Sequence, residues 1–304
     1  MPTRAAHDQQ HRQEVIILAQ YGSDAPAARE FNRARKRSFL NDIDAFLHGY
    51  TNRLLSFDEV SQSVSTGQLI DLGLQEVPLA AIRGSVDRYR DFDLAFLPRR
   101  SGLRDRWERV ASARSHGLPV PPVDLYKLGD IYFVRDGNHR VSVARSRGDR
   151  TIQARVIELV SRVPIYPDLT PDDLPGIEAY ADFLRLTEAD RYLPGVDLRL
   201  TQPRNYARLL RHIALFRYLN RQPGEEPRQW PEAVRAWYEQ LYQPFLVIIE
   251  DSGVMDHFPT RTTTDLYMWL VTHFRQLHSR LPRPTEFSQI EDDLHIYLAP
   301  YLDL

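Results

Sequence analysis

The pattern of hydrophobic and polar positions in the middle of the chain predicts alternating strands and helices. Short apolar runs bounded by turn residues are typical of strands, and they occupy residues 77–82, 123–126, 131–134 and 152–159. Apolar residues recur at helical spacing over residues 103–116 and 141–147, and Gly117 and Gly148 end these two segments. The Leu128-Gly129-Asp130 turn joins the second strand to the third as a hairpin. The central segment is therefore predicted to be a compact α+β unit with a small mixed sheet.

Helical patterns dominate on both sides of this unit. Residues 26–55 carry apolar side chains at helical spacing, and residues 56–75 are predicted to form a further helix and a turn, with Gly67 and Gly73 as breaks. A proline-rich linker is predicted over residues 164–175, and the helices expected beyond it include residues 202–220, 231–251 and 264–280. We therefore expect an N-terminal helical region (1–75), an α+β domain (76–162) and a C-terminal α-helical domain (163–304).

Composition and charge narrow the class of protein. Hydrophobic residues make up 42% and charged residues 26% of the 304 residues, which is the balance of a globular chain. The net charge of −2 excludes a uniformly basic surface for nucleic acid. The absence of cysteine excludes disulfides, cysteine-ligated metals and a cysteine nucleophile. The first residues are too polar for a signal peptide, and no apolar run approaches the ~20 residues of a membrane span, so we expect a cytoplasmic protein with no membrane partner.

The segment with the clearest chemistry is Asp136-Gly137-Asn138-His139-Arg140, between a predicted strand and a predicted helix. The first turn of a helix favours an anion because its backbone N–H groups are unpaired and the helix dipole is positive there. Gly137 allows close approach of a ligand, Asn138 and His139 can donate hydrogen bonds, and Arg140 can bind phosphate oxygens as a fork. Asp136 can accept from a ribose hydroxyl, orient the histidine or hold a metal through water. Alternatively, the segment is a polar turn that caps the helix.

The order of elements from residue 77 to residue 159 resembles the ParB/sulfiredoxin superfamily. The resemblance runs through "VPLAAI", "HGLPVPPV", "VDLYKLGDIYFV", "DGNHRVSVAR" and "TIQARVIEL". The matching turn binds the phosphates of CTP in ParB proteins and ATP in sulfiredoxins, and in related free-serine kinases it is rich in Asp, Gly and His. Asp136, Gly137, His139 and Arg140 match this pattern. The resemblance therefore implies a nucleotide site at this turn.

The chain also departs from the superfamily's patterns. Asn138 stands where sulfiredoxins have their cysteine, which excludes sulfinic-acid repair. The Glu-Asn-x-x-Arg stretch that ParB uses with its nucleotide and metal does not follow Leu159, and no helix-turn-helix supports centromere binding. Residues 258–273 are similar to the helical module that follows a ParB-like domain in a bacterial family.

A second candidate element is the turn after the first predicted strand. Arg88 is similar in position to an arginine that reaches the phosphates in ParB-like folds, and Ser85 can add a hydroxyl. Asp87 is a candidate base or magnesium ligand, and Glu76, just before the strand, is a further candidate catalytic carboxylate. Alternatively, this turn is a surface loop rich in salt bridges, each of which contributes little to stability.

These observations favour a nucleotide-binding regulatory or switch protein. The expected ligand is CTP, ATP or ADP with Mg²⁺ on its phosphates, while no metal-ligand set is predicted among the protein's own residues. A homodimer or a protein partner would form through the helical regions. The alternative is an enzyme of the kinase or NTPase kind, in which Asp136, Asp87 or Glu76 positions a nucleophile. A DNA-binding or nuclease protein is a weaker alternative, which needs the basic run at residues 33–37 to share one surface with Arg145, Arg147 and Arg150.

Overall fold

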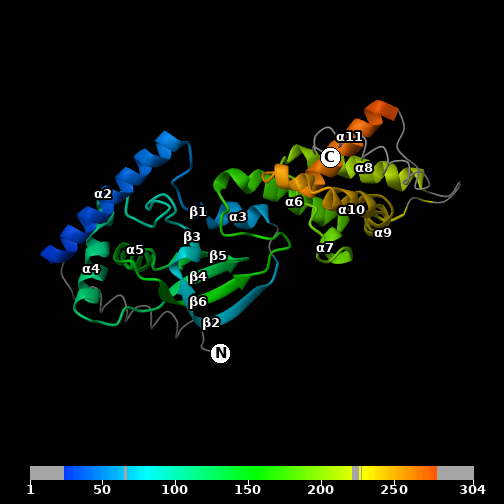
Figure 1. The fold of residues 1–304 in the computed structure, drawn as a ribbon. Coiled ribbons are helices and arrows are strands. Elements are labelled where there is room, and N and C mark those ends of the chain that lie inside the picture. Colours follow the sequence, from blue (N-terminus) through cyan, green and yellow to red (C-terminus); the bar gives the residue numbers. More distant parts are fainter. Residues whose placement is uncertain (1–23, 65–66, 221–225, 227, 279–304) are drawn as a thin grey trace. The chain divides into compact units, whose positions relative to one another are not determined.

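The computed structural model describes residues 24–64, 67–220, 226 and 228–278, and the chain divides into two compact units, Met1–Leu174 and Pro175–Leu304 (Figure 1). A six-stranded mixed sheet of order β1-β3-β5-β4-β6-β2 forms the centre of the first unit. Its strands are β1 (Leu55–Ser56), β2 (Leu69–Pro78), β3 (Ile82–Ser85), β4 (Val123–Leu128), β5 (Ile131–Asp136) and β6 (Thr151–Leu159). Strands β1, β3 and β5 run parallel, β4 is antiparallel to β5 and parallel to β6, and β2 is antiparallel to β6.

The helices of the first unit pack against one another and the sheet. They are α2 (Ala25–His48), α3 (Phe57–Ser63), α4 (Arg104–Ser115) and α5 (Asn138–Arg147). Helix α5 contacts β4 and α4, and α4 in turn contacts α2. Trp107 of α4 is fully buried between them, donates from Nε1 to Ser142 Oγ of α5 at 2.9 Å, and meets the ring of Phe31 of α2 edge-on. This contact fixes α4 beside the middle of α5.

The α+β class, with a central mixed sheet and helices on both sides of it in the sequence, is confirmed. The predicted hairpin is β4 and β5, which pair Leu128 with Ile131 across a Gly129-Asp130 turn, and Gly129 has a positive φ of 57°. The predicted helix over residues 141–147 starts three residues earlier, at Asn138, and ends where expected because Gly148 adopts the left-handed conformation.

The expectation of a helix and turn over residues 56–75 is only half correct. Helix α3 forms at its start, but residues 69–75 belong to β2, the strand at the edge of the sheet. Most of β2 is exposed, including Leu69 and Leu74, and the register shifts between Asp71 and Gly73. An edge strand that buries neither face clearly lacks the alternation by which strands are found in a sequence, which explains the error.

Helix α2 confirms the helical spacing after residue 26, but its large apolar side chains do not all face the core. Phe31 is fully buried, whereas Phe39, Phe46 and Leu47 are 64%, 85% and 71% exposed. Small residues supply most of the rest of its buried face, among them Ala27, Ala34, Ser38 and Ala45. The periodicity therefore located the helix without identifying its buried face.

The second unit is helical, as expected. Its elements are α6 (Leu174–Thr187), α7 (Ala189–Tyr192), α8 (Arg204–Leu219), α9 (Trp230–Trp237), α10 (Gln243–Asp251) and α11 (Thr263–His278), with a π-helical turn at Tyr238–Tyr242. The predicted segment 231–251 is thus divided, and the last two residues of the predicted segment 264–280 lie outside the described residues. Fully buried Tyr267 sits at the core, where Trp237 Nε1 donates to its hydroxyl at 3.1 Å and His212 Nε2 lies 2.7 Å from the same oxygen. Within the described ranges, no helix is both long and apolar enough to cross a membrane.

Candidate functional site

The turn from β5 to α5 is built on Gly137. Its φ of +101° lies in the left-handed region, and a Cβ at this position would meet Val123 Cγ1 at 2.6 Å and Arg140 Nε at 2.9 Å. The first hydrogen bond of α5 runs from Val141 N to Gly137 O at 3.0 Å, and no side chain among the described residues caps the helix. The first turn of α5 is therefore an uncapped helix N-terminus, where an anion is favoured.

Arg140 and Asp136 have structural partners within this turn. Arg140 Nη1 donates to the backbone carbonyls of Pro121 and Pro122 at 3.0 and 2.7 Å, and its Nη2 donates to Asp136 Oδ2. The Arg140 side chain is only 10% exposed. Arg140 therefore holds the segment before β4 against the start of α5. The contacts of Arg140 and Asp136 fit the alternative interpretation, in which this segment is a structural turn.

Asn138 and His139 differ from their neighbours in the turn. Asn138 is 9% exposed, and its Oδ1 and both ring nitrogens of His139 are buried without a hydrogen-bond partner in the described structure. The His139 ring meets Phe92 edge-on, with centroids 5.7 Å apart. Burial, followed by the positive charges of Arg88 and other arginines, lowers the pKa of His139 to about 4. His139 is therefore a neutral imidazole at neutral pH, with one N–H donor and one acceptor nitrogen.

Three arginines from two elements contribute positive charge at His139. Arg88 lies in the turn after β3, and Arg106 and Arg109 lie on α4; all three lower the histidine's pKa, whereas Asp91 opposes them. Strands β3 and β5 are parallel neighbours, so the turns that follow them leave the sheet at the same edge. The topology thus brings Arg88 to the turn that the sequence predicted as its partner.

The end of β3 and the loop that follows it, residues 84–93, form most of their polar contacts within the protein. Fully buried Ser85 donates from Oγ to Val134 O at 3.3 Å and accepts from Arg88 N at 3.2 Å. Asp91 pairs with Arg88 at 3.1 Å and with Arg100 at 3.3 Å. Asp93 is fully buried and accepts from Asn41 Nδ2 and Leu97 N, and burial raises the pKa of its carboxyl above the usual range. Ser85 and Asp93 hold the loop in place.

The two remaining predicted carboxylates are both exposed. Asp87 lies in the turn after β3, close to Arg88 in sequence. Glu76 lies on β2, where it pairs in register with Gln153, and two strands separate β2 from β5. At ~4.8 Å between strands, Glu76 is on the order of 14 Å across the sheet from the strand that carries the turn. The structure therefore brings Arg88, Ser85 and the turn together and leaves Glu76 apart.

Sequence reasoning missed three charged residues near this site. Arg106 and Arg109 stand three apart, a spacing that places both on one face of a predicted helix and could have been noticed. Asp124 of β4 is 7% exposed, is the register partner of Asp136, and lies 3.3 Å from Arg135 and 3.8 Å from Arg155. An acid inside an apolar strand was the available signal. Among the described residues, no group of three histidines or carboxylates could hold a metal.

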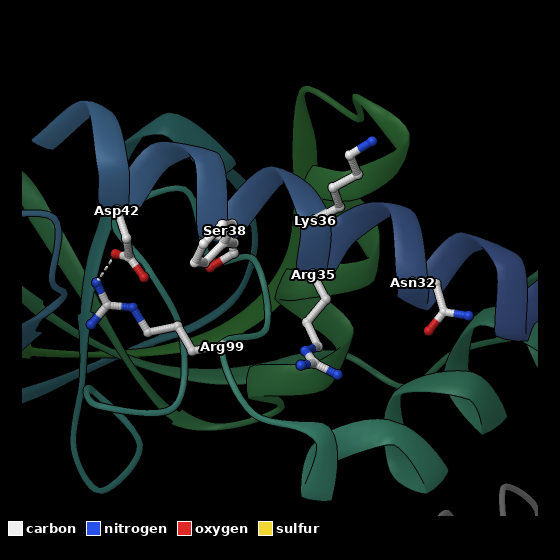
Figure 2. A pocket seen from close by; sticks show the side chains of 7 residues that line it. Asn32, Arg35, Lys36, Ser38, Asp42 and Arg99 are labelled. Atoms are coloured by element: carbon white, nitrogen blue, oxygen red, sulfur yellow. Dashed lines mark hydrogen bonds and ion pairs between the residues drawn. The ribbon is translucent and has the colours of Figure 1, made fainter.

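The basic run at residues 33–37 lies on α2, where it borders a pocket of about 330 Å³ (Figure 2). Figure 2 shows the side chains of Arg35 and Lys36 leaving the helix in different directions. Arg99, on the far wall, donates to Asp42 and to the backbone carbonyl of Asn52. Arg99 thus ties the loop before α4 to α2, and the run does not present one uniform basic surface.

Comparison with known proteins yields one solved structure. It is the sulfiredoxin from Arabidopsis thaliana, which is 24% identical, with 29% of this chain and 86% of that chain covered and a TM-score of 0.21. No protein-family model matches the chain, and no curated protein matches it.

Proposed function

We propose that this protein is a nucleotide-binding regulatory protein of the ParB/sulfiredoxin-like type, with the phosphates held at the turn 136–140. The observation that carries the proposal is His139. In the described structure, a half-buried imidazole whose two buried ring nitrogens have no hydrogen-bond partner lies in the first turn of α5, in the positive field of three arginines. Buried polar atoms in proteins normally have partners, so this arrangement is best explained by a bound anion with its own donors and acceptors.

Each group has a distinct role in this proposal. The backbone N–H groups of the first turn of α5 and the N–H of neutral His139 donate to phosphate oxygens. Arg88, whose side chain is 42% exposed, adds a charge-assisted contact at the rim. Arg140 is a positioning residue, because its guanidinium already binds two carbonyls and Asp136. This assignment differs from the role that the family resemblance implied for Arg140.

The nucleotide proposed is CTP, ATP or ADP, bound with Mg²⁺. When bound, Mg²⁺ would neutralise negative charge on the phosphate groups, and it usually keeps several water ligands. The nearby carboxylates would contribute little to binding Mg²⁺, because Asp136 already pairs with Arg140 and Asp91 already pairs with Arg88 and Arg100.

The state of these carboxylates also favours regulation over catalysis. A general base needs a carboxylate free to take a proton within reach of the substrate. Asp136 and Asp91 are both engaged by arginines and Glu76 lies across the sheet, which leaves exposed Asp87 as the candidate base of the enzyme alternative. Binding of the nucleotide is then the event that the helical regions transmit to a partner or a second copy.

One observation supports the alternative, an enzyme of the kinase or NTPase kind. Buried Asp124 faces Asp136 across the β4–β5 ladder, beside Arg135 and Arg155. If it serves chemistry, Asp124→Asn will abolish release of nucleoside diphosphate or phosphoryl transfer while nucleotide binding persists. The DNA-binding alternative loses support, because Arg145 binds the carbonyls of Leu79 and Ile82 and Arg147 pairs with Glu30.

The test is thermal stability with CTP, ATP, ADP, GTP or UTP plus Mg²⁺, followed by calorimetry. A ligand at ~100 times its Kd stabilises a protein by about 2.7 kcal/mol. We expect one nucleotide to stabilise the protein, and His139→Leu, Arg88→Gln and Arg106→Gln to weaken its binding. Arg90→Gln is the matched control, because Arg90 is an exposed arginine of the same loop. No stabilisation by any nucleotide, or equal weakening in the control, would overturn the proposal.

A further inference from the structure

The second unit contains a pocket of about 630 Å³, formed by the start of α8, the segment after Gly253 and the first turns of α11. This volume lies within the range of small-molecule sites, ~300–1,000 Å³. The pocket involves neither the turn 136–140 nor any residue of the first unit. It is therefore independent of the proposed nucleotide site.

Much of the pocket wall is apolar. Met255, Phe258, Met268 and Trp269 line it. Phe258 is 51% exposed and Trp269 41% exposed, so both of these aromatic side chains of the lining keep part of their surface accessible. When a hydrocarbon or aromatic group covers neighbouring apolar side chains of this size, their removal from water stabilises the complex.

The polar part of the wall is cationic. Arg204 and Arg208 stand four residues apart on α8 and thus on one face of that helix, and Arg261 joins them from the segment before α11. Arg208 donates to Asn205 Oδ1 at 3.4 Å and Arg261 donates to Thr201 Oγ1 at 2.9 Å, which are neutral acceptors. Within the described residues, none of the three arginines has a carboxylate partner.

The carboxylate in the pocket lining, Asp265, binds backbone groups rather than these arginines. Asp265 accepts from the backbone N–H groups of Thr201 and Thr262, at 3.2 and 3.1 Å, and thereby caps α11. The lining therefore holds three guanidinium groups and one carboxylate, whose oxygens accept hydrogen bonds from backbone donors. The pocket combines an apolar wall with an excess of positive charge.

We propose that this pocket binds a small amphipathic anion. Its aliphatic or aromatic body packs on Phe258, Met255 and Trp269, and its carboxylate or phosphate group binds the arginines. An inorganic anion would leave the apolar wall uncovered, and an uncharged hydrocarbon would leave the arginines without a partner. A ligand with both parts satisfies the whole wall.

The experiment uses octanoate as the probe, with the full chain, in isothermal titration calorimetry. Acetate supplies the charged group without the body, and 1-octanol supplies the body without the charge. We expect octanoate to bind with one molecule per chain and about tenfold more tightly than either comparison compound, because both halves of the wall contribute. Tryptophan fluorescence should also change on binding, because Trp269 lines the pocket.

Two variants test the two halves of the wall. Arg208→Gln and Phe258→Ser alter exposed side chains and should each weaken octanoate binding severalfold. Arg211→Gln is the matched control, because Arg211 is an exposed arginine of the same helix that does not line the pocket. The proposal is overturned if octanoate does not bind, if 1-octanol binds equally well, or if Arg211→Gln weakens binding as much as Arg208→Gln.

Discussion

The turn at residues 136–140 and the loop at residues 84–93 leave the same edge of the sheet and carry similar residues, but they use them differently. In the loop, the buried polar side chains of Ser85 and Asp93 have hydrogen-bond partners in the protein. In the turn, Arg140 is held by backbone carbonyls, while Asn138 and His139 keep buried polar atoms that have no hydrogen-bond partner among the described residues. The buried polar side chains of the loop thus have their hydrogen bonds within the protein, whereas part of those in the turn do not within the described structure.

This difference separates polar side chains that stabilise the fold from polar side chains that can bind a ligand. Residue type does not make the distinction, since an arginine and a histidine one position apart belong to opposite classes. Substitution of a satisfied residue should lower the free energy of unfolding, whereas substitution of an unsatisfied one should chiefly affect binding. Four substitution experiments test this distinction.

The largest effect is expected for Arg140→Met. The change removes hydrogen bonds to Pro121, Pro122 and Asp136 from a side chain that is 10% exposed, and leaves the two carbonyls without this donor. We expect a loss of about 2–4 kcal/mol in the free energy of unfolding, measured with urea. A variant as stable as the parent that no longer binds nucleotide would instead make Arg140 a ligand-binding residue.

Gly137→Ala is expected to cost about 2 kcal/mol or more. The added Cβ is strained at a φ of +101° and meets Val123 at 2.6 Å. Gly148→Ala, at the other end of α5, is the matched control, since its φ is +80° but nothing lies within 4 Å of the added atom. The control should cost about 1 kcal/mol, from backbone strain alone. Equal losses would show that the close approach to Val123 has no energetic effect.

His139 should make the stability of the first unit depend on pH. Its pKa is about 4 in the folded chain, compared with 6.5 for an ordinary histidine, so the unfolded chain binds the proton first. Its contribution is therefore complete above pH 6.5 and is lost as pH falls toward 4, by roughly 3 kcal/mol in total. Comparison of parent and His139→Leu unfolding curves from pH 7 to pH 4 isolates this contribution. Parallel curves for the two proteins would contradict the assignment.

The smallest effects are expected for Glu76→Gln and Asp87→Asn. Both side chains are exposed, so each change should alter the free energy of unfolding by less than about 0.5 kcal/mol. Nucleotide affinity, measured by calorimetry, should stay unchanged for Glu76→Gln because β2 lies two strands away from β5. A marked loss of nucleotide turnover in either variant would favour the enzyme alternative.

Local chemistry made much of the first unit predictable. The glycines at 129 and 148, together with the apolar runs beside them, are enough to locate the hairpin and the end of α5 along the chain. Residues 69–76 of β2 escaped prediction because β2 is an exposed edge strand whose pattern does not alternate. The strand predicted over residues 77–82 was wrong as one element, since it comprises the end of β2, a 3-10 turn at Leu79–Ala81 and the start of β3. The place of β2 in the sheet depends on pairing with β6, about 80 residues later in the chain.

The site was predictable as a location and less so as a set of roles. Gly137 could be identified from the needs of a strand-to-helix turn. The role of Arg140 could not, because its carbonyl partners, Pro121 and Pro122, are 18–19 residues away and approach it only in the folded chain. Arg106 and Arg109 likewise act on His139 only because α4 packs against α5.

The buried hydroxyl of Tyr267 is a shared hydrogen-bond centre for the core of the helical unit. The indole N–H of Trp237 can only donate, so the Tyr267 oxygen accepts from it, and His212 Nε2 lies 2.7 Å from the same oxygen. Burial raises the pKa of the Tyr267 hydroxyl, so the group keeps its hydrogen and can donate as well as accept. Because His212 lies on α8, Trp237 on α9 and Tyr267 on α11, three helices that are separate in the sequence meet at one buried oxygen.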